Sequence, residues 1–415
     1  MSVGAQSSVP GTILIVGAGQ AGGRAAETLR TQGFEGRIVL VGDEECLPYE
    51  RPPLSKDVML ATEDANCFSA WLHPEAFYGD ARIEWLCDYV ERLDCAARIA
   101  VLRHHGAIHF DRCLLATGGR ARELPVAGGA RNVCSLRTLA DAKRLRERMV
   151  NARAVAVIGG GFLGLEFAAS AWARGLEVTV YESAPRLLGR AVPEQFADRL
   201  RLKHESHGVQ FVFSPGPLEI GQSPAGVSVK GSQGTRAYDF CVAAIGQLPN
   251  EELARTSGIE VKNGILVDAW CRTSAPGIYA AGDCANFPFG PERRATRLES
   301  WQNAQEQAVV AARNMLGEMV EYRPLPWFWT DQYDWNIQIQ GVLDGSIEQW
   351  IERRSADEKA LLMGLRGGAI VYALAVNQGG ELRAIRGLIE RATVVDAAAL
   401  VDPSVRLREL ARKAG

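Results

Sequence analysis

The stretch Thr12-Ile13-Leu14-Ile15-Val16-Gly17-Ala18-Gly19-Gln20-Ala21-Gly22 decides the fold of this chain. Its first five residues, which are mostly apolar and β-branched, are typical of a strand that is buried on both faces of a parallel sheet. The three glycines allow a tight turn, a close approach of the backbone to a phosphate, and close packing of the next helix. The N–H groups at the start of that helix attract phosphate oxygens. The stretch therefore predicts the opening of a dinucleotide-binding unit.

The same pattern occurs twice in the chain. After the first turn, residues 37–41 form a second predicted strand and Asp43 follows it. In mid-chain, residues 154–158 enter a second glycine turn, 159–164, and Glu182 ends the next strand. Each acid lies about 20 residues beyond its turn, where a carboxylate binds a ribose hydroxyl. Two such units predict two bound dinucleotides.

Composition and charge exclude several classes of protein. Apolar residues make up 47% and charged residues 23% of the chain, close to the averages for soluble globular proteins. We find no apolar run near 18 residues, so no transmembrane helix is expected. The N-terminal residues lack the cationic and apolar parts of a signal peptide, which favours a cytoplasmic protein with no membrane partner. The 46 basic and 49 acidic residues nearly balance, which argues against nucleic-acid binding.

Cysteine and histidine spacing predicts no metal site. The nine cysteines are too widely spaced for a zinc knuckle or an iron–sulfur cluster, and we interpret them as free thiols. His204 and His207 have the spacing of two helical ligands but no accompanying carboxylate cluster. We therefore expect both histidines at the surface.

Six further segments carry a resemblance to a known family. They are LPYERPPLSK (47–56), ATG (116–118), LRT (136–138), GGGFLGLE (159–166), AAGDCA (280–285) and PWFWTDQY (326–333). The chain resembles the NADH-dependent ferredoxin reductases of bacterial oxygenase systems, of the ring-hydroxylating dioxygenase and putidaredoxin reductase type. The resemblance runs from about Thr12 into the C-terminal region, and its most specific parts are RPPLSK and PWFWTDQY.

The resemblance implies an α/β fold like that of glutathione reductase, with two Rossmann-type domains and an α+β C-terminal domain. We expect a discontinuous FAD-binding domain, 1–122 and 248–325, and an inserted NADH-binding domain, 123–247. The C-terminal interface domain is expected at 326–415, after the prolines at 324 and 326.

The resemblance also implies which residues bind the two cofactors. FAD contacts are expected at Gly17, Gly19, Gly22, Asp43, Arg51, Lys56, Val90, Thr117, Gly118, Arg137, Asp283 and Trp301. NADH contacts are expected at Gly159, Gly161, Gly164, Glu166, Glu182 and Gly246. Trp301 departs from the smaller residue expected at its position. Lys56 and Glu166 are the predicted catalytic residues, as a charged pair that stabilises reduced flavin and orients the nicotinamide amide.

The predicted reaction needs a flavin because its two partners handle electrons differently. NADH gives two electrons as a hydride, whereas the [2Fe-2S] ferredoxin takes them singly, and a flavin can do both. Glu182 would repel a 2′-phosphate, although Arg186 could weaken that effect, so we favour NADH over NADPH. Arg293, Arg294 and Arg297 are candidates to attract an acidic ferredoxin.

Three other functions stay open on the residues alone. The main rival is an NADH oxidase or disulfide reductase that uses Cys46, although no second cysteine lies nearby in the sequence. A rubredoxin reductase would perform the same chemistry with a different acceptor. A non-enzymatic flavoprotein resembling apoptosis-inducing factor would call for a basic surface, which the formal net charge of −3 does not favour.

Overall fold

The computed structural model describes residues 10–61, 70–126, 132–223, 226–356 and 358–413. The chain forms two compact units, each assembled from separate segments. The first unit consists of residues 1–52, 65–120 and 247–324, and the second of residues 53–64, 121–246 and 325–415. No helix among the described residues is both long and apolar enough to cross a membrane.

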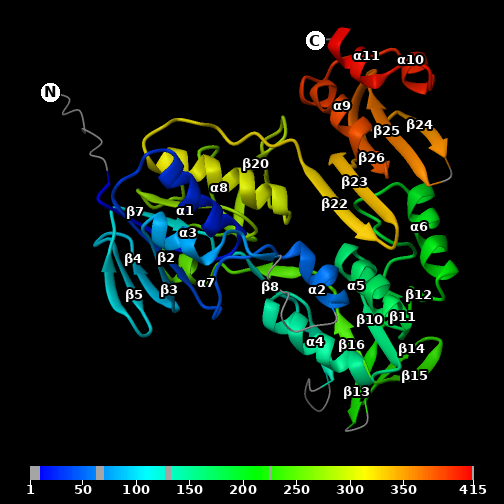
Figure 1. Ribbon diagram of the computed structural model, residues 1–415, viewed down its shortest axis with the longest axis horizontal. Coiled ribbons are helices and arrows are strands. Elements are labelled where there is room, and N and C mark those ends of the chain that lie inside the picture. The colour runs from blue at the N-terminus through cyan, green and yellow to red at the C-terminus, as the bar shows by residue number, and fades with distance from the viewer. Residues whose placement is uncertain (1–9, 62–69, 127–131, 224–225, 357, 414–415) are drawn as a thin grey trace. The chain divides into compact units, whose positions relative to one another are not determined.

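The first unit is built on a five-stranded parallel sheet (Figure 1). Its strands, in spatial order, are β19 (Ile278–Ala280), β7 (Arg112–Leu115), β1 (Thr12–Val16), β2 (Arg37–Gly42) and β3 (Ile83–Cys87). Helices α1 (Gln20–Thr31) and α8 (Trp301–Met315) pack against each other, and their alanines join the buried core of the sheet. The central strand is buried because Ile13, Leu14 and Ile15 are fully covered. The predicted first strand has the bounds of β1.

Smaller elements surround this sheet. They are α3 (Glu75–Asp80), the antiparallel sheet of β4 (Val90–Asp94), β5 (Ile99–Leu102) and β6 (Gly106–His109), the pair β8 (Gly119–Ala121) and β17 (Gln247–Pro249), α7 (Glu252–Thr256), β18 (Ile265–Leu266), β20 (Ala285–Phe289) and β21 (Arg294–Thr296). The short η1 turn (Pro52–Ser55) follows Arg51 and leads out of the first unit.

The second unit contains a second five-stranded parallel sheet with the same winding. Its strands, in spatial order, are β12 (Gln210–Phe213), β11 (Glu177–Glu182), β10 (Ala154–Ile158), β16 (Phe240–Ala243) and β9 (Val133–Ser135). Its helices are α2 (Asp57–Leu60), α4 (Leu139–Asn151), α5 (Phe162–Ala173) and α6 (Glu194–Ser206), and β13 (Glu219–Ser223), β14 (Gly226–Gly231) and β15 (Gly234–Tyr238) form an antiparallel side sheet. The predicted second strand, 154–158, has the bounds of β10.

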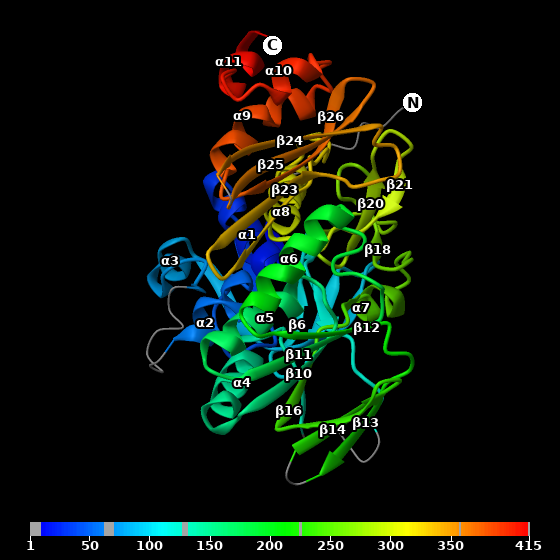
Figure 2. The ribbon, with the colours of Figure 1, turned by 90° about the vertical axis from the view of Figure 1, so that its right-hand side faces the viewer.

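The C-terminal part of the second unit is an antiparallel sheet with helices beyond it (Figure 2). The strands, in spatial order, are β22 (Trp327–Gln332), β23 (Trp335–Gly341), β26 (Ala369–Val376), β25 (Lys359–Arg366) and β24 (Gln349–Ala356). The helices are α9 (Gly379–Glu390), α10 (Ala397–Val401) and α11 (Leu407–Lys413). Duplicated parallel sheets followed by an α+β region confirm the predicted fold class.

One grouping differs from the predicted domain boundaries. Residues 53–64, expected within the FAD-binding domain, belong to the second unit, where α2 packs against α4 and α5. Residues 325–415 also join this unit, because α5 packs against β22. The division into three domains stays a prediction.

Candidate functional site

The glycine turn of the first unit has room for a ligand only at its middle glycine. Gly17 has φ +110°, and a Cβ there would lie 2.2 Å from the carbonyl oxygen of Ala116. A Cβ on Gly22 would lie 1.9 Å from the carbonyl oxygen of Gly17, so neither position accepts a side chain. A Cβ on Gly19, which caps α1, would have its nearest neighbour 3.9 Å away. The start of the helix is therefore open to a phosphate group.

A cavity of about 440 Å³ adjoins this turn within the first unit. Four of the predicted FAD contacts line it, namely Gly17, Asp43, Val90 and Thr117. Its other lining residues are Val16, Val41, Gly42, Asp88, Tyr89, Arg120, Asn250, Glu252 and Leu253. The cavity combines backbone at a helix start, a carboxylate after β2 and an apolar wall, and these features suit the adenosine and pyrophosphate of a dinucleotide.

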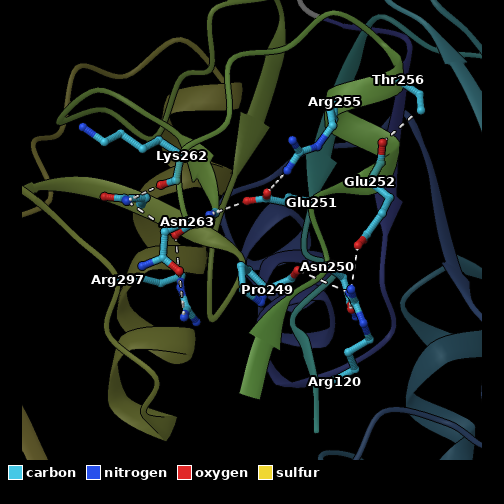
Figure 3. Close-up of polar contacts among 12 residues, drawn as sticks. Arg120, Pro249, Asn250, Glu251, Glu252, Arg255, Thr256, Lys262, Asn263 and Arg297 are labelled. Carbon is cyan, nitrogen blue, oxygen red and sulfur yellow. Dashed lines mark hydrogen bonds and ion pairs between the residues drawn. The ribbon is translucent and has the colours of Figure 1, made fainter. Parts of the chain in front are cut away.

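A set of side-chain hydrogen bonds that the sequence did not predict holds one wall of this cavity. Figure 3 shows three of the residues, Arg120, Asn250 and Glu252. The Thr117 hydroxyl donates to the Asn250 carbonyl oxygen at 2.6 Å, and the Asn250 side-chain amide donates back to the Thr117 carbonyl oxygen at 2.9 Å. Arg120 donates to the Asn250 side chain at 2.9 Å and pairs with Glu252 at 2.8 Å. The signal in the sequence was the Pro249-Asn250 pair at the end of β17, where the chain returns from the inserted segment.

Other predicted FAD contacts of the first unit have definite partners. Arg51 pairs with Glu44 at 2.7 Å and covers the ring of Tyr49. The indole N–H of Trp301, the first residue of α8, donates to Glu50 at 3.2 Å. The remaining two are Gly118, with φ +64°, and Asp283, whose carboxylate accepts from the Gln247 side chain at 3.1 Å.

The first unit fits FAD on its own geometry. Gln20 follows the open Gly19, is buried, and has both side-chain polar atoms without a hydrogen-bond partner in the structure. Buried polar groups normally find partners, so a partner from outside the chain is expected at the start of α1. FAD supplies pyrophosphate and ribose oxygens for such groups.

The three candidate docking arginines differ in their surroundings. The side chain of Arg297 is 8% exposed and donates to the Asn263 carbonyl oxygen at 3.2 Å (Figure 3). It also donates to the Asp283 carbonyl oxygen at 3.1 Å, so it stabilises this loop. The prediction of a solvent-facing role is wrong for Arg297. Arg293 and Arg294 are exposed, and Arg294 pairs with Glu292 at 2.5 Å.

The second unit repeats the glycine-turn geometry. Gly159 has φ +113°, and a Cβ there would lie 2.3 Å from the Ala244 carbonyl oxygen. A Cβ on Gly164 would lie 2.1 Å from the Gly159 carbonyl oxygen, whereas one on Gly161, at the start of α5, would meet open space. Gly246 has φ +94° in the loop that follows β16. This turn can therefore receive a second pyrophosphate.

Glu182 is aimed at this second turn. Its carboxylate accepts from the Gly160 N–H at 2.7 Å and from the Ala184 N–H at 2.7 Å. Arg186 donates instead to the carbonyl oxygens of Gly189 at 2.8 Å and Val192 at 3.0 Å. The guanidinium is therefore occupied by backbone, and the carboxylate favours a ribose with free hydroxyls over one with a 2′-phosphate.

Lys56 and Glu166 form an ion pair within the second unit. The Lys56 Nζ lies 3.1 Å from the Glu166 carboxylate and 3.6 Å from that of Asp331. The Lys56 ammonium also lies over the ring of Trp329. Glu166 is 6% exposed, so it does not face solvent from its helix. Burial raises the pKa of Glu166, and the Lys56 charge and hydroxyl donors oppose that rise.

Arg137, a predicted FAD contact, lies in the second unit just before α4. Its backbone N–H donates to the Asp141 carboxylate at 3.0 Å, beside the capping box that Thr138 and Asp141 form. This contact explains the local backbone, and the role of the Arg137 guanidinium in FAD binding stays a prediction.

His204 contradicts the expectation of a surface histidine. Its side chain is fully buried, and its two ring nitrogens lie 2.8 Å from Gln332 Oε1 and 2.9 Å from the Tyr333 hydroxyl. Burial lowers the pKa of His204 to about 4. The sequence could not show this because its partners come from β22 and the following turn, far along the chain.

The cysteines show no dithiol among the described residues. Cys67 lies outside them, and none of the other eight forms a disulfide. Burial raises the pKa of Cys241 to about 12, which leaves this thiol protonated and inert. Cys46 lies half-buried in the loop after β2. No cluster of metal-binding side chains occurs in the parts of the chain that the structure describes.

Two family models match the chain. The model described as pyridine nucleotide-disulphide oxidoreductase matches residues 11–308, and the one described as reductase C-terminal matches residues 327–411. Together they cover both glycine turns and the antiparallel C-terminal sheet.

Relatives of known function share nearly the whole chain. The ferredoxin–NAD(+) reductase component of the anthranilate 1,2-dioxygenase system of Burkholderia cepacia is 40% identical over 95% of this chain and 98% of its own. Rhodocoxin reductase of Rhodococcus erythropolis is 40% identical over 83% of this chain and 81% of its own.

Two solved structures share the fold at high similarity. The ferredoxin reductase for the CYP199A2 system of Rhodopseudomonas palustris has a TM-score of 0.92 and 36% identity, over 97% of this chain and 100% of its own. The covalent putidaredoxin reductase–putidaredoxin complex has a TM-score of 0.90 and 33% identity, over 97% of this chain and 98% of the matched chain.

Proposed function

Because the chain belongs to the pyridine nucleotide-disulphide oxidoreductase family, we propose that it passes electrons from NADH through FAD to a [2Fe-2S] ferredoxin of an oxygenase system. The observation that carries the two cofactors is the duplicated glycine turn, each open at its middle glycine. The ferredoxin acceptor follows from the relatives that share nearly the full chain with this protein.

The two units divide the cofactor binding. Gly17, Gly19 and Gly22 hold the FAD pyrophosphate at the start of α1, and Asp43 binds the ribose. Val90 and Thr117 line the cavity. The rest of the cofactor contacts Gly118, Arg51, Asp283 and Trp301. When bound, FAD accepts two electrons as a hydride and releases them one at a time.

The second unit binds and orients NADH. Gly159, Gly161 and Gly164 receive its pyrophosphate, Glu182 accepts hydrogen bonds from the ribose, and Gly246 leaves backbone room opposite the turn. We assign the catalytic roles to Lys56 and Glu166. Glu166 orients the nicotinamide amide through its carboxylate, and Lys56 keeps that carboxylate ionised while supplying positive charge for reduced flavin.

The alternatives receive less support. An oxidase or disulfide reductase that uses Cys46 is less favoured, because two relatives that share most of this chain are ferredoxin–NAD(+) reductase components. A rubredoxin reductase would use the same two cofactors. Only the acceptor protein distinguishes it from a ferredoxin reductase. The use of NADH fits a cytoplasmic enzyme.

Rapid-reaction kinetics test the proposal. The FAD-loaded protein, mixed anaerobically with NADH, should lose its yellow absorbance, and cytochrome c reduction should then depend on added [2Fe-2S] ferredoxin. Slow bleaching, or equal cytochrome c reduction without ferredoxin, would contradict the proposed function. Reduction supported by rubredoxin but not by ferredoxin would establish the rubredoxin alternative.

A further inference from the structure

A chain of buried polar side chains leads away from Glu166 inside the second unit. The Thr330 hydroxyl lies 2.6 Å from Glu166 Oε1, and the Gln332 Nε2 lies 3.1 Å from that hydroxyl. Gln332 Oε1 lies 2.8 Å from His204 Nε2, and His204 Nδ1 lies 2.9 Å from the Tyr333 hydroxyl. Thr330, Gln332 and His204 are each at most 1% exposed. The chain joins α5, β22 and α6.

The donors and acceptors of this chain have one consistent direction. An ionised carboxylate only accepts, so Thr330 donates to Glu166 and its oxygen accepts from the Gln332 amide. The Gln332 carbonyl oxygen then requires an N–H on His204 Nε2. Since a neutral imidazole carries one N–H, His204 Nδ1 accepts from the Tyr333 hydroxyl. Four consecutive hydrogen bonds therefore point toward the carboxylate.

We propose that Thr330, Gln332 and His204 are positioning residues that hold the Glu166 carboxylate in one rotamer and keep it ionised. The inference rests on the proposed function only in that Glu166 serves the reaction with NADH. Hydrogen bonds aligned in one direction polarise one another, so the remote Tyr333 hydroxyl strengthens the donor at the carboxylate.

The charges around the chain agree with this role. Lys56 Nζ lies 3.1 Å from Glu166 Oε1, the oxygen to which Thr330 also donates, and Asp331 lies 3.6 Å from Lys56 Nζ. The Ser55 hydroxyl donates to the second carboxylate oxygen of Glu166 at 2.5 Å. Next to His204, the ring of His207 stacks on Tyr333, while Lys203 pairs with Asp334 and Glu358. Both ring nitrogens of His204 are taken by the neutral groups Gln332 and Tyr333, so the neutral ring suits the site.

Removal of one hydroxyl tests the positioning role. Thr330→Val deletes the donor and keeps the side-chain shape, whereas Thr330→Ser keeps the donor. In anaerobic stopped-flow reduction by NADH, Thr330→Val should move the acidic limb of the pH–rate profile upward by about one pH unit, a tenfold change in proton affinity. Thr330→Ser should restore the wild-type profile.

A matched control is Thr235→Val on β15, an exposed strand of the same unit. It should leave the profile unchanged. If Thr330→Val and Thr330→Ser both gave the wild-type profile, the positioning role would be overturned. If the wild-type protein were not reduced by NADH at all, the proposed function would fail instead.

A spectroscopic measurement tests the chain independently of activity. Long-range ¹H–¹⁵N spectra of the FAD-loaded protein with labelled histidine should show His204 as the neutral Nε2–H tautomer at pH 7. Gln332→Leu removes the carbonyl oxygen that accepts from His204 Nε2 and should shift His204 toward the Nδ1–H tautomer. His207→Gln should leave the His204 signals in place. A protonated or Nδ1–H His204 in the wild-type protein would disprove the proposed direction.

Discussion

At the residue scale, a backbone carbonyl oxygen close to the first glycine of each turn leaves no room for a side chain there. We expect Gly17→Val to abolish FAD binding, because its Cβ would lie 2.2 Å from a carbonyl oxygen and its φ of +110° disfavours a branched side chain. The purified variant should be colourless. Gly79→Val, at an exposed site where a Cβ meets nothing within 4 Å, should stay yellow. A yellow Gly17→Val protein with normal FAD content would contradict the assignment of FAD to the first unit.

The preference for NADH over NADPH is also expected to depend on a single residue, Glu182. Glu182→Ala removes a carboxylate that would bind a ribose hydroxyl and repel a 2′-phosphate. Loss of such a hydrogen bond costs about 1.5–3 kcal/mol, so kcat/KM for NADH should fall tenfold or more and the preference over NADPH should relax. Glu177→Ala, at the exposed start of β11, is the control. An unchanged NADH/NADPH ratio would mean that the ribose binds elsewhere.

The buried His204 makes stability depend on pH. Its pKa in the fold is about 4, below the ordinary value of about 6.5, so between these values the unfolded chain binds more protons. The stabilisation is therefore complete above about pH 6.5 and is lost as the pH falls toward 4. Urea unfolding should show a shallower decline over this window for His204→Gln than for the wild type. His207→Gln should decline like the wild type, and equal slopes for all three would contradict the burial of a neutral ring.

At the element scale, α4 depends on its first turn. The Thr138 hydroxyl accepts from the Asp141 N–H, and the Asp141 carboxylate accepts from the Thr138 N–H, so two free amides of the helix start are satisfied. Thr138→Ala should lower the free energy of unfolding by about 1 kcal/mol. Chemical denaturation measures this loss. Lys143→Ala, exposed on the same helix, should change it by less than about 0.5 kcal/mol, and an equal effect of both would argue against the cap.

At the scale of the whole molecule, the delivery of electrons to a ferredoxin can be measured separately from their uptake from NADH. Salt would weaken the attraction between an acidic ferredoxin and exposed arginines, whereas it would not affect hydride transfer between bound cofactors. Arg293→Glu with Arg294→Glu should therefore slow ferredoxin-dependent cytochrome c reduction at low salt and leave flavin reduction by NADH intact. Slower flavin reduction would show that this loop supports the cofactor site, and no change in either step would remove these arginines from the docking surface.

The sequence predicted the features whose residues are close together in the chain. The strand bounds at 12–16 and 154–158 follow from short apolar runs, and the glycine positions follow from a turn that spans six residues. Glu182 could be predicted for the same reason, since its strand lies next to the turn it serves. The family resemblance extended the prediction to the fold class and to the ferredoxin partner.

The sequence by itself therefore determined the two nucleotide-binding units, because a strand, a glycine turn and a helix N-terminus are consecutive in the chain. Only the tertiary structure decided that Asp331 lies beside the predicted Lys56–Glu166 pair, that the Arg297 side chain is buried, and that His204 lies in the core. Each depends on partners brought together from distant segments. The physical reason is that the burial of a side chain and the direction of its hydrogen bonds depend on every group around it. A local sequence pattern contains only the groups that are adjacent in the chain.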